Sequence, residues 1–283
     1  MIQAEVDLKS PLVSVIITTK DEEKNIENCL KSVINQTYKN IEIILVDNYS
    51  TDKTREIAKK YTDKIYLKGP ERSAQRNYGA QKARGKYLLF LDADMILSPT
   101  VIEECVQKCE KEGYIALYIP ERIIGEGFWI KVRDFERQFY TGTVIDAVRF
   151  IRRDIFFKAG EFDEELTGPE DWDLDRRIRQ LGKVGIISSP LYHNEGRFPV
   201  RKYLRKKKYY FEGIQKYVQK WGRNDPEVRK QVGLWYRLIG VFIERNKWKL
   251  LLRHPILTVA MYYLKLRIAV EYLRFILRSR ITK

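Results

Sequence analysis

The stretch Lys86-Tyr-Leu-Leu-Phe-Leu-Asp-Ala-Asp-Met95 decides the fold of this chain. Its run from Tyr87 to Leu91 contains no charged residue, which is typical of a strand that is buried on both faces of a parallel sheet. The run ends at Asp92 and Asp94. Ligands of open α/β sheets bind at the carboxyl ends of the strands, where two carboxylates can share a hard cation and, through it, a diphosphate. Alone, this Asp-X-Asp pattern also fits a solvated loop that caps the next helix.

Short apolar runs before this stretch alternate with helical patterns. Strands are expected at 11–17, 41–46 and 64–67, and helices at 25–35, from about 52 to 61 and at 73–82. This alternation predicts an α/β fold whose parallel strands are joined by right-handed crossovers. Asp47 ends the second of these strands and Glu22 follows the first, so four acidic residues are expected at one edge of one sheet.

Several motifs follow one another between residues 15 and 174. They are Val15-Ile-Ile-Thr-Thr-Lys-Asp-Glu-Glu-Lys-Asn-Ile26, Val46-Asp-Asn-Tyr-Ser-Thr-Asp52, Arg76-Asn-Tyr-Gly79, Ala83-Arg-Gly-Lys-Tyr87, Phe90-Leu-Asp-Ala-Asp94, Gly160-Glu-Phe-Asp-Glu-Glu-Leu166 and Gly168-Pro-Glu-Asp-Trp-Asp-Leu174. Over about residues 11–196 they resemble the family 2 glycosyltransferases, among them membrane-associated archaeal and bacterial enzymes of lipid-linked glycans. The resemblance implies the GT-A fold, which is a Rossmann-like domain with a mostly parallel sheet, and the transfer of a sugar from a nucleotide to an acceptor.

The resemblance also implies roles for residues at the predicted sheet edge. Glu22 and Asp47 match nucleotide contacts, with Asp47 accepting a hydrogen bond from the base, and Arg76 matches a phosphate contact. Asp92 matches a contact to the ribose or the metal side, and Asp94 matches the direct ligand of Mg²⁺ or Mn²⁺. A divalent cation suits this chemistry because a departing nucleoside diphosphate gains negative charge, which a fixed cation stabilises without a proton.

The second predicted centre is Glu170-Asp171-Trp172-Asp173, just before a helix expected at 174–181. Acids at a helix N-terminus are favourable by about 0.3–1 kcal/mol each, so capping alone is one explanation. An inverting transfer needs one general base for the acceptor hydroxyl. The resemblance gives this role to Asp171, with Glu170 beside it and Trp172 as a stacking platform for sugar, while no second, nucleophilic carboxylate is recognisable.

His193 lies in Leu191-Tyr-His-Asn-Glu195, after a strand expected at 184–188. A lone histidine is most often structural. The resemblance places this one where related enzymes carry a further metal ligand, so both readings stay open. The three cysteines lack the paired spacing of a disulfide framework, and a buried structural role is expected for Cys105 and Cys109.

The net charge of +15 is distributed unevenly. Residues 1–196 hold 30 Lys and Arg against 33 Asp and Glu, whereas residues 197–283 hold 23 against 5, a balance of +18. We therefore expect two parts, a GT-A catalytic domain at 1–196 and a basic, amphipathic helical region at 197–283. The start of the chain is short and charged, which does not fit a signal peptide.

Three helices are expected in the basic region, at 198–221, from about 226 to 252 and from 255 onward. Amphipathic helices rich in Lys and Arg typically lie in the interface of anionic lipid, so a membrane-surface role is favoured. The longest stretch without charge is 11 residues, at 254–264, which is short of the roughly 20 that a simple span needs. A re-entrant hairpin, self-association and packing on the catalytic domain stay alternatives. Nucleic acid is not expected as a partner, because no nucleic-acid motif accompanies the basic residues.

Together these observations predict a metal-dependent, inverting glycosyltransferase at the cytoplasmic face of the cell membrane. Its donor would be a GDP- or UDP-sugar, and its acceptor a lipid-linked saccharide or a polyprenyl or dolichyl phosphate. The alternatives are a soluble or peripheral transferase that acts on polysaccharide or protein, and a GT-A binding module without catalysis. The sequence leaves the base, the sugar and the acceptor open.

Overall fold

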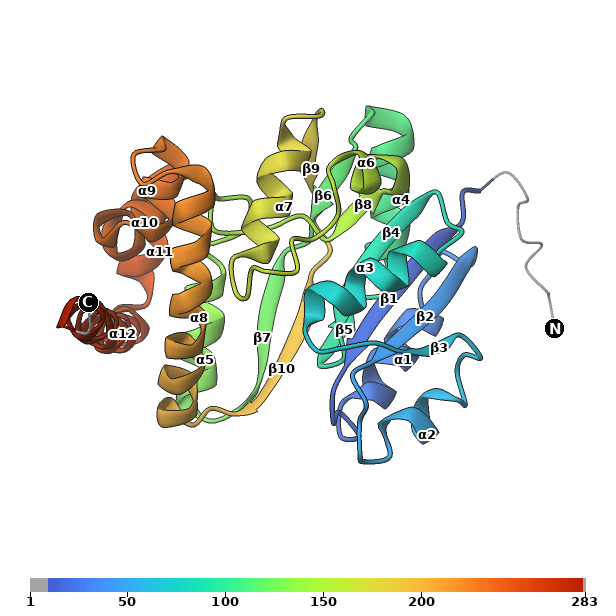
Figure 1. The fold of residues 1–283 in the computed structure, drawn as a ribbon, viewed down its shortest axis with the longest axis horizontal. Helices are drawn as coiled ribbons and strands as arrows, with labels where there is room; N and C mark the ends of the chain where they lie inside the picture. The colour runs from blue at the N-terminus through green and yellow to red at the C-terminus, as the bar shows by residue number, and fades with distance from the viewer. Residues whose placement is uncertain (1–9, 282–283) are drawn as a thin grey trace. The chain divides into compact units, whose positions relative to one another are not determined.

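The computed structural model describes residues 10–281, apart from the side chains of residues 200–202, 204–209, 272 and 275–281. The chain divides into two compact units (Figure 1). Unit 1 comprises the described part of Met1–Glu121, together with Ala147–Glu164 and Leu174–Asn194, and unit 2 comprises Arg122–Asp146, Glu165–Asp173 and the described part of Glu195–Lys283. The division at residue 196 that we expect from the charge stays a prediction about the roles of the two segments. In the structure, residues 122–146 and 165–173 belong to the same compact unit as the C-terminal helices.

Unit 1 is built on a seven-stranded sheet in the order β3-β2-β1-β4-β8-β6-β9. The strands are β1 (Val13–Thr19), β2 (Ile41–Asp47), β3 (Ile65–Leu67), β4 (Tyr87–Asp92), β6 (Ala116–Tyr118), β8 (Phe150–Arg152) and β9 (Val184–Ile186). β1 pairs in parallel with β2 and β4, as β2 does with β3 and β6 with β9, whereas β8 runs antiparallel to both of its neighbours. The prediction of an α/β fold with a mostly parallel sheet is confirmed.

Helices cover both faces of this sheet, as the alternation of buried side chains along β4 shows. Tyr87, Leu89 and Leu91 belong to a core shared with α1 (Ile26–Ile34) and α4 (Val101–Glu112). Leu88 and Phe90 belong to a second core, which packs against α3, α6 and α7. These are α3 (Arg72–Lys82), α6 (Arg153–Lys158) and α7 (Glu170–Arg179), of which α7 begins in unit 2, and the short α2 (Thr54–Ala58) belongs to unit 1. Because both faces are covered, the strand has no polar alternation.

A second, three-stranded sheet has the order β5-β10-β7, with β5 (Met95–Leu97), β7 (Glu121–Glu126) and β10 (Leu191–Arg197). β5 follows β4 after a two-residue connection and pairs antiparallel with β10, so that His193 lies opposite Met95. This pairing brings the segment around His193 to the end of the central strand of the first sheet.

Unit 2 is helical. Its helices are α5 (Phe128–Arg137), α8 (Val200–Trp221), α9 (Pro226–Val232), the π-helical η1 (Tyr236–Gly240), α10 (Val241–Ile243), η2 (Glu244–Asn246), α11 (Trp248–Arg253) and α12 (Pro255–Ile281). Asp225 caps α9, accepting bonds of 3.0 Å from the amides of Glu227 and Val228. Within the described residues, no helix combines the length and the apolar content that crossing a bilayer requires.

The single helix predicted from about 226 to 252 is wrong, because several short segments occupy this range. Gly233 takes an extended conformation and ends α9. Arg245 and Asn246 have φ angles of 53° and 60°, in the left-handed region, which a right-handed helix cannot include. The helical pattern of the sequence therefore did not reveal these breaks in the backbone.

Candidate active site

Asp94 is the acidic residue of the sheet edge whose side chain retains an unused oxygen. Its Oδ2 lies 3.0 Å from Nε2 of His193, and its backbone oxygen accepts a 2.8 Å bond from the amide of Asn194. Its Oδ1 is buried and has no hydrogen-bond partner in the structure. A buried carboxylate oxygen without a partner is costly, and a bound cation is one way to satisfy it.

His193 is held between two carboxylates of unit 1. Its Nδ1 lies 3.1 Å from Oε1 of Glu121, and Oε2 of Glu121 accepts a 3.0 Å bond from Arg149. Burial would lower the pKa of His193, but its bonds with Asp94 and Glu121 raise it to about 10. The second carboxylate orients the imidazole, as the outer partners of metal-binding histidines do. Sequence reasoning missed Glu121, which is 72 residues away in the chain and has no motif of its own.

Asp92 forms an ion pair with the buried side chain of Arg76. Its Oδ1 accepts a 2.9 Å bond from Arg76 and a 3.1 Å bond from the hydroxyl of Thr18, while Arg72 lies 3.8 Å from its Oδ2. Burial alone would raise the pKa of Asp92, but the charges of Arg76 and Arg72 hold it well below its usual range. The guanidinium of Arg76 also lies 5.1 Å from the ring centre of Phe162. The phosphate role of Arg76 and the ribose role of Asp92 stay predictions, and they compete with this pairing.

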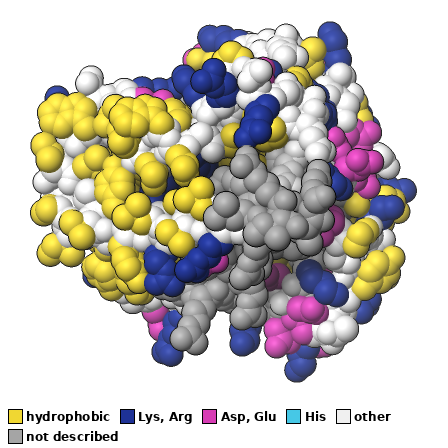
Figure 2. Space-filling view, turned by 60° about the vertical axis from the view of Figure 1, so that its left-hand side comes forward, with side chains coloured by type: hydrophobic (Ala, Val, Ile, Leu, Met, Phe, Trp, Pro, Cys, Tyr) yellow, Lys and Arg dark blue, Asp and Glu magenta, His cyan; other side chains and the backbone are white. Residues whose placement is uncertain are grey.

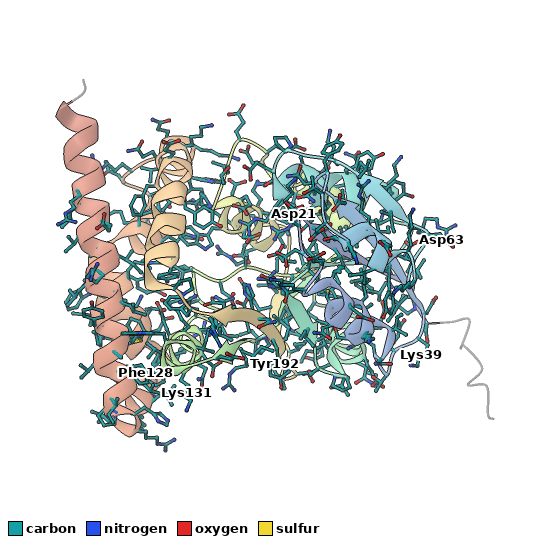
Figure 3. All side chains as sticks on the ribbon, turned by 90° about the horizontal axis from the view of Figure 1, so that it is seen from below. Asp21, Lys39, Asp63, Phe128, Lys131 and Tyr192 are labelled. Carbon is teal, nitrogen blue, oxygen red and sulfur yellow. The ribbon has the colours of Figure 1, made fainter. Side chains whose placement is uncertain are left out.

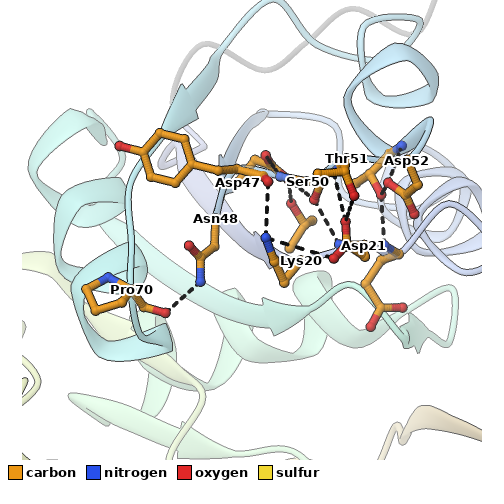
Figure 4. Close-up of polar contacts among 12 residues, drawn as sticks. Lys20, Asp21, Asp47, Asn48, Ser50, Thr51, Asp52 and Pro70 are labelled. Carbon is orange, nitrogen blue, oxygen red and sulfur yellow. Dashed lines mark hydrogen bonds and ion pairs between the residues drawn. The ribbon is translucent and has the colours of Figure 1, made fainter.

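Asp47 orders the loop that follows β2 (Figure 4). It is fully buried, and its two oxygens accept bonds from the amide of Ser50 at 2.8 Å, the hydroxyl of Ser50 at 2.5 Å and the hydroxyl of Thr19 at 2.7 Å. Lys20 donates to the carbonyl of Tyr49 at 3.1 Å, which ties the loops after β1 and β2 together. The contact of Asp47 with a base stays a prediction, and its observed contacts fix the backbone of the predicted base-binding loop.

Glu22 lies beside these acids at the end of β1. Burial, and then the charges of Asp94 and Asp92, raise its pKa, while a 2.8 Å bond from Asn25 opposes this rise. Asn25 in turn accepts a 3.0 Å bond from Asn194, the neighbour of His193. The four predicted acids of the edge are thus brought together, whereas the linking asparagines carry no chemical signal by which the sequence alone could have identified them.

The predicted acceptor centre belongs to the first turn of α7, in unit 2, and its acids differ in accessibility. Glu170 is buried and accepts a 2.5 Å bond from the amide of Gly168. Asp173 is fully buried and accepts bonds from Trp221 at 2.7 Å and Lys220 at 2.9 Å. Asp171 is half-buried, so it is the acid of this turn that solvent or a substrate can reach.

The ring of Trp172 already has contacts within unit 2, although the sequence predicts that it stacks on a sugar. Its indole donates a 3.2 Å bond to the carbonyl of Ile145, and its ring meets Tyr217 edge to face with centres 6.2 Å apart. Arg237 lies 5.6 Å from the ring centre. The predicted contact of Trp172 with sugar is untested by these packing contacts and stays a prediction.

Metal ligation by the described residues would have to involve few side chains. No group of three or more His, Cys, Asp or Glu side chains among them is arranged to hold a metal ion. Mg²⁺ sites commonly use one or two carboxylates and complete their coordination with substrate phosphates and water. The unpartnered Oδ1 of Asp94 fits such a site. The expected burial of Cys105 and Cys109 is confirmed, and neither lies in this site.

Known proteins share both the sequence pattern and the fold. The uncharacterized glycosyltransferase EpsJ of Bacillus subtilis (strain 168) is 28% identical over 216 residues, which cover 64% of this chain and 60% of that protein. The mannosyltransferase PcManGT from Pyrobaculum calidifontis, solved with GDP-Man and Mn²⁺, superposes with a TM-score of 0.63 and 17% identity over 94% of this chain and 88% of its own.

S. aureus TarS 1-349, solved with UDP, superposes with a TM-score of 0.52 and 21% identity over 72% of this chain and 65% of its own. These structural likenesses show the predicted GT-A-like fold. The chain spans about three fifths of the length of EpsJ. Residues 14–162, more than half of the chain, match the family described as Glycosyl transferase family 2. This chain therefore belongs to glycosyl transferase family 2.

Proposed function

We propose that this chain is an inverting glycosyltransferase that uses Mg²⁺ or Mn²⁺ to transfer a sugar from a GDP- or UDP-sugar to a hydroxyl or phosphate acceptor. The observation that carries the proposal is the buried, unpartnered Oδ1 of Asp94, next to His193 at the carboxyl edge of the sheet. The related structures support the donor class, because PcManGT holds GDP-Man and Mn²⁺ and TarS holds UDP.

In this proposal the residues of unit 1 bind the donor. Asp94 would hold the cation through its unpartnered Oδ1, and His193 would join it by releasing its bond to Oδ2 of Asp94. A bound cation stabilises the negative charge of the leaving diphosphate. Glu121 keeps the imidazole of His193 oriented, while Asp47 keeps the loop after β2 in place for the base. Arg72, partly exposed at the start of α3 and 3.8 Å from Asp92, would be a contact for a phosphate group.

Asp171 would be the general base of unit 2. It is half-buried, whereas Glu170 and Asp173 on either side are buried and hold local structure. A general base needs access to the acceptor hydroxyl, which a half-buried side chain allows. Within the described first turn of α7 the accessible carboxylate is that of Asp171, which supports inversion, since a covalent route would need a second carboxylate as nucleophile.

A lipid-linked saccharide or a polyprenyl phosphate is the proposed acceptor, at the cytoplasmic face of the membrane. The charge of +18 in residues 197–283 supports this part of the proposal. Transfer to polysaccharide or protein by a soluble or peripheral enzyme is the second candidate, and a binding module without catalysis is the third. Turnover with a lipid acceptor separates the first from both others.

The Asp94→Asn variant tests the metal site. It should lose Mn²⁺-dependent binding of UDP or GDP by at least tenfold in calorimetry and remain folded, because the amide keeps the shape but not the charge. Asp63→Asn is the matched control, since Asp63 is an exposed residue of the same unit (Figure 3). Unchanged Mn²⁺-dependent binding by Asp94→Asn would show that Asp94 does not belong to the metal site. Inversion is tested separately on the wild-type product, and a product with the anomeric configuration of the donor would rule it out.

A further inference from the structure

Helix α12 buries a lysine and exposes a row of apolar residues. Lys265 is buried, with Nζ 3.0 Å from Oε1 of Glu136 and 2.8 Å from the hydroxyl of Tyr140 on α5 and the turn after it. The exposed side holds an apolar row at three- and four-residue spacing: Ile256, Val259, Tyr263, Leu266, Val270 and Leu273. Among the described side chains of residues 256–274, the exposed ones outside this row are Arg267 and Arg274. A helix in contact with water normally shows the opposite arrangement.

The row is long and strongly exposed. Ile256 and Val259 are 73% and 72% exposed, and from Ile256 to Leu273 the row extends about 26 Å along the helix axis. We call this row, together with Phe128 beside it, the apolar face. Isolated exposed apolar residues are ordinary, but a continuous row of this length marks an interaction surface.

A groove continues the apolar face toward α5. It has a volume of about 560 Å³ and is lined by apolar and aromatic side chains, among them Phe128, Trp129, Ile256, Val259 and Tyr263. Trp129 and Tyr263 stack with ring centres 6.0 Å apart, and Phe128 lies at the end of α5 next to α12 (Figure 3). The residues named on the wall of the groove are apolar or aromatic, which suits hydrocarbon, and they offer no charged partner to a polar ligand.

Either a second copy of this chain or an anionic lipid surface could cover the apolar face, and the charge around the face distinguishes between them. Residues 233–274 hold eight Lys and Arg but two acids, and Glu271 is already paired with Arg274 at 3.0 Å. Lys249, Arg253 and Arg267 are exposed. Figure 2, which turns the side of the C-terminal helices forward, shows hydrophobic side chains gathered there with Lys and Arg at their border. A second copy would bring the same excess of positive charge, whereas anionic headgroups would neutralise it.

We propose that the apolar face lies in the headgroup region of an anionic bilayer, with α12 parallel to the membrane plane and the basic residues at the level of the lipid phosphates. In such helices the buried apolar area and the electrostatic attraction to anionic lipid add to the strength of binding. The Lys265–Glu136 contact fixes the rotation of α12 about its axis, so that the row faces outward. This inference deepens the proposed membrane association by assigning it to specific residues.

Flotation of the full chain with vesicles tests the proposal. Wild type should float with vesicles of 70% phosphatidylcholine and 30% phosphatidylglycerol, and 1 M NaCl applied after binding should not release it, because insertion is not screened. Ile256→Glu/Val259→Glu should partition at least tenfold more weakly, and so should the single variant Leu266→Glu. Ile34→Glu, on an exposed apolar residue of α1, is the control and should float like wild type.

The lipid charge gives a second readout. Arg253→Gln/Arg267→Gln should lose the preference for anionic over purely zwitterionic vesicles. Wild type that does not float, or Ile256→Glu/Val259→Glu that floats as well as Ile34→Glu, would overturn the proposal. A wild type that does not float but is dimeric by light scattering, with a monomeric double variant, would overturn it in favour of self-association. Mn²⁺-dependent donor hydrolysis, measured without vesicles, should be equal in all these variants; its absence in wild type would count against the proposed enzyme and not against the membrane surface.

Discussion

Removal of the guanidinium of Arg76 is predicted to destabilise unit 1 strongly. The side chains of Arg76 and Asp92 are 2% and 19% exposed, and their nitrogen and oxygen lie 2.9 Å apart. Breaking a buried ion pair by removing one partner typically costs about 3–5 kcal/mol, because the remaining charge stays buried without compensation. Arg72 and the hydroxyl of Thr18 still contact Asp92, so we expect the lower end for Arg76→Met, about 3 kcal/mol.

The assay is thermal and urea unfolding of wild type and Arg76→Met, with Arg84→Met as a matched control on a side chain that is 74% exposed. A loss of about 3 kcal/mol corresponds to a Tm lower by roughly 6–12 °C, whereas the control should change the stability by less than about 0.5 kcal/mol. The folded-state pKa of Asp92 is depressed, so its stabilising contribution is present above its unfolded pKa of about 3.9 and is lost as pH falls. The difference between wild type and Arg76→Met should therefore narrow below about pH 4.

Donor affinity decides what the result means. If the main role of Arg76 is to compensate the buried charge of Asp92, the variant should lose stability. It should keep most of its affinity for UDP or GDP at a temperature where it is folded. A variant that loses less than about 1 kcal/mol but binds the nucleotide tenfold more weakly would refute this reasoning. Arg76 would then contact the phosphates, as the family resemblance implies.

Two further substitutions test unit 2. Asp171→Asn should keep donor and metal affinity in calorimetry but lose turnover by about 10²–10⁴-fold, and near-normal turnover would exclude it as the base. Gly213→Ala should destabilise the chain by about 1–3 kcal/mol in urea unfolding, because a Cβ there would lie 1.9 Å from the carbonyl oxygen of Thr167, in the segment that leads into α7. Gln215→Ala, at an exposed position of the same helix, should leave the stability unchanged. If the two variants were equally stable, the segment around Thr167 would have to move away from the added Cβ without cost, and the prediction would be wrong.

The strands of unit 1 could be predicted because the physical signal is local. Residues such as Leu88 and Leu89 on β4 are buried on opposite faces, so the whole run is apolar and needs no knowledge of its neighbours. The same reasoning failed between residues 226 and 252. There buried residues such as Val228, Tyr236 and Phe242 continue past Gly233, although the helix does not, and the left-handed Arg245 breaks the helical backbone again.

Partners distant in sequence could not be predicted, because they depend on how the elements pack. Asp92 meets Arg76 and His193 meets Glu121 only after the sheets have formed. The sequence pattern also could not predict which side of α12 is buried. Lys265 belongs to a helix that looks basic and amphipathic, and its burial against Glu136 becomes apparent only with α5 in place.

The four acids at the edge of the sheet share a location but not a role, and the geometry separates them. Asp47 has its oxygens occupied by the loop after β2, and Asp92 is neutralised by Arg76. Glu22 accepts a bond from Asn25 and, because its pKa is raised, carries its charge less readily than an ordinary glutamate. Asp94 retains a buried oxygen with no partner. A cation needs a carboxylate oxygen that is fixed and not already satisfied. Of the four acids Asp94 offers such an oxygen, since His193 holds its other oxygen in place.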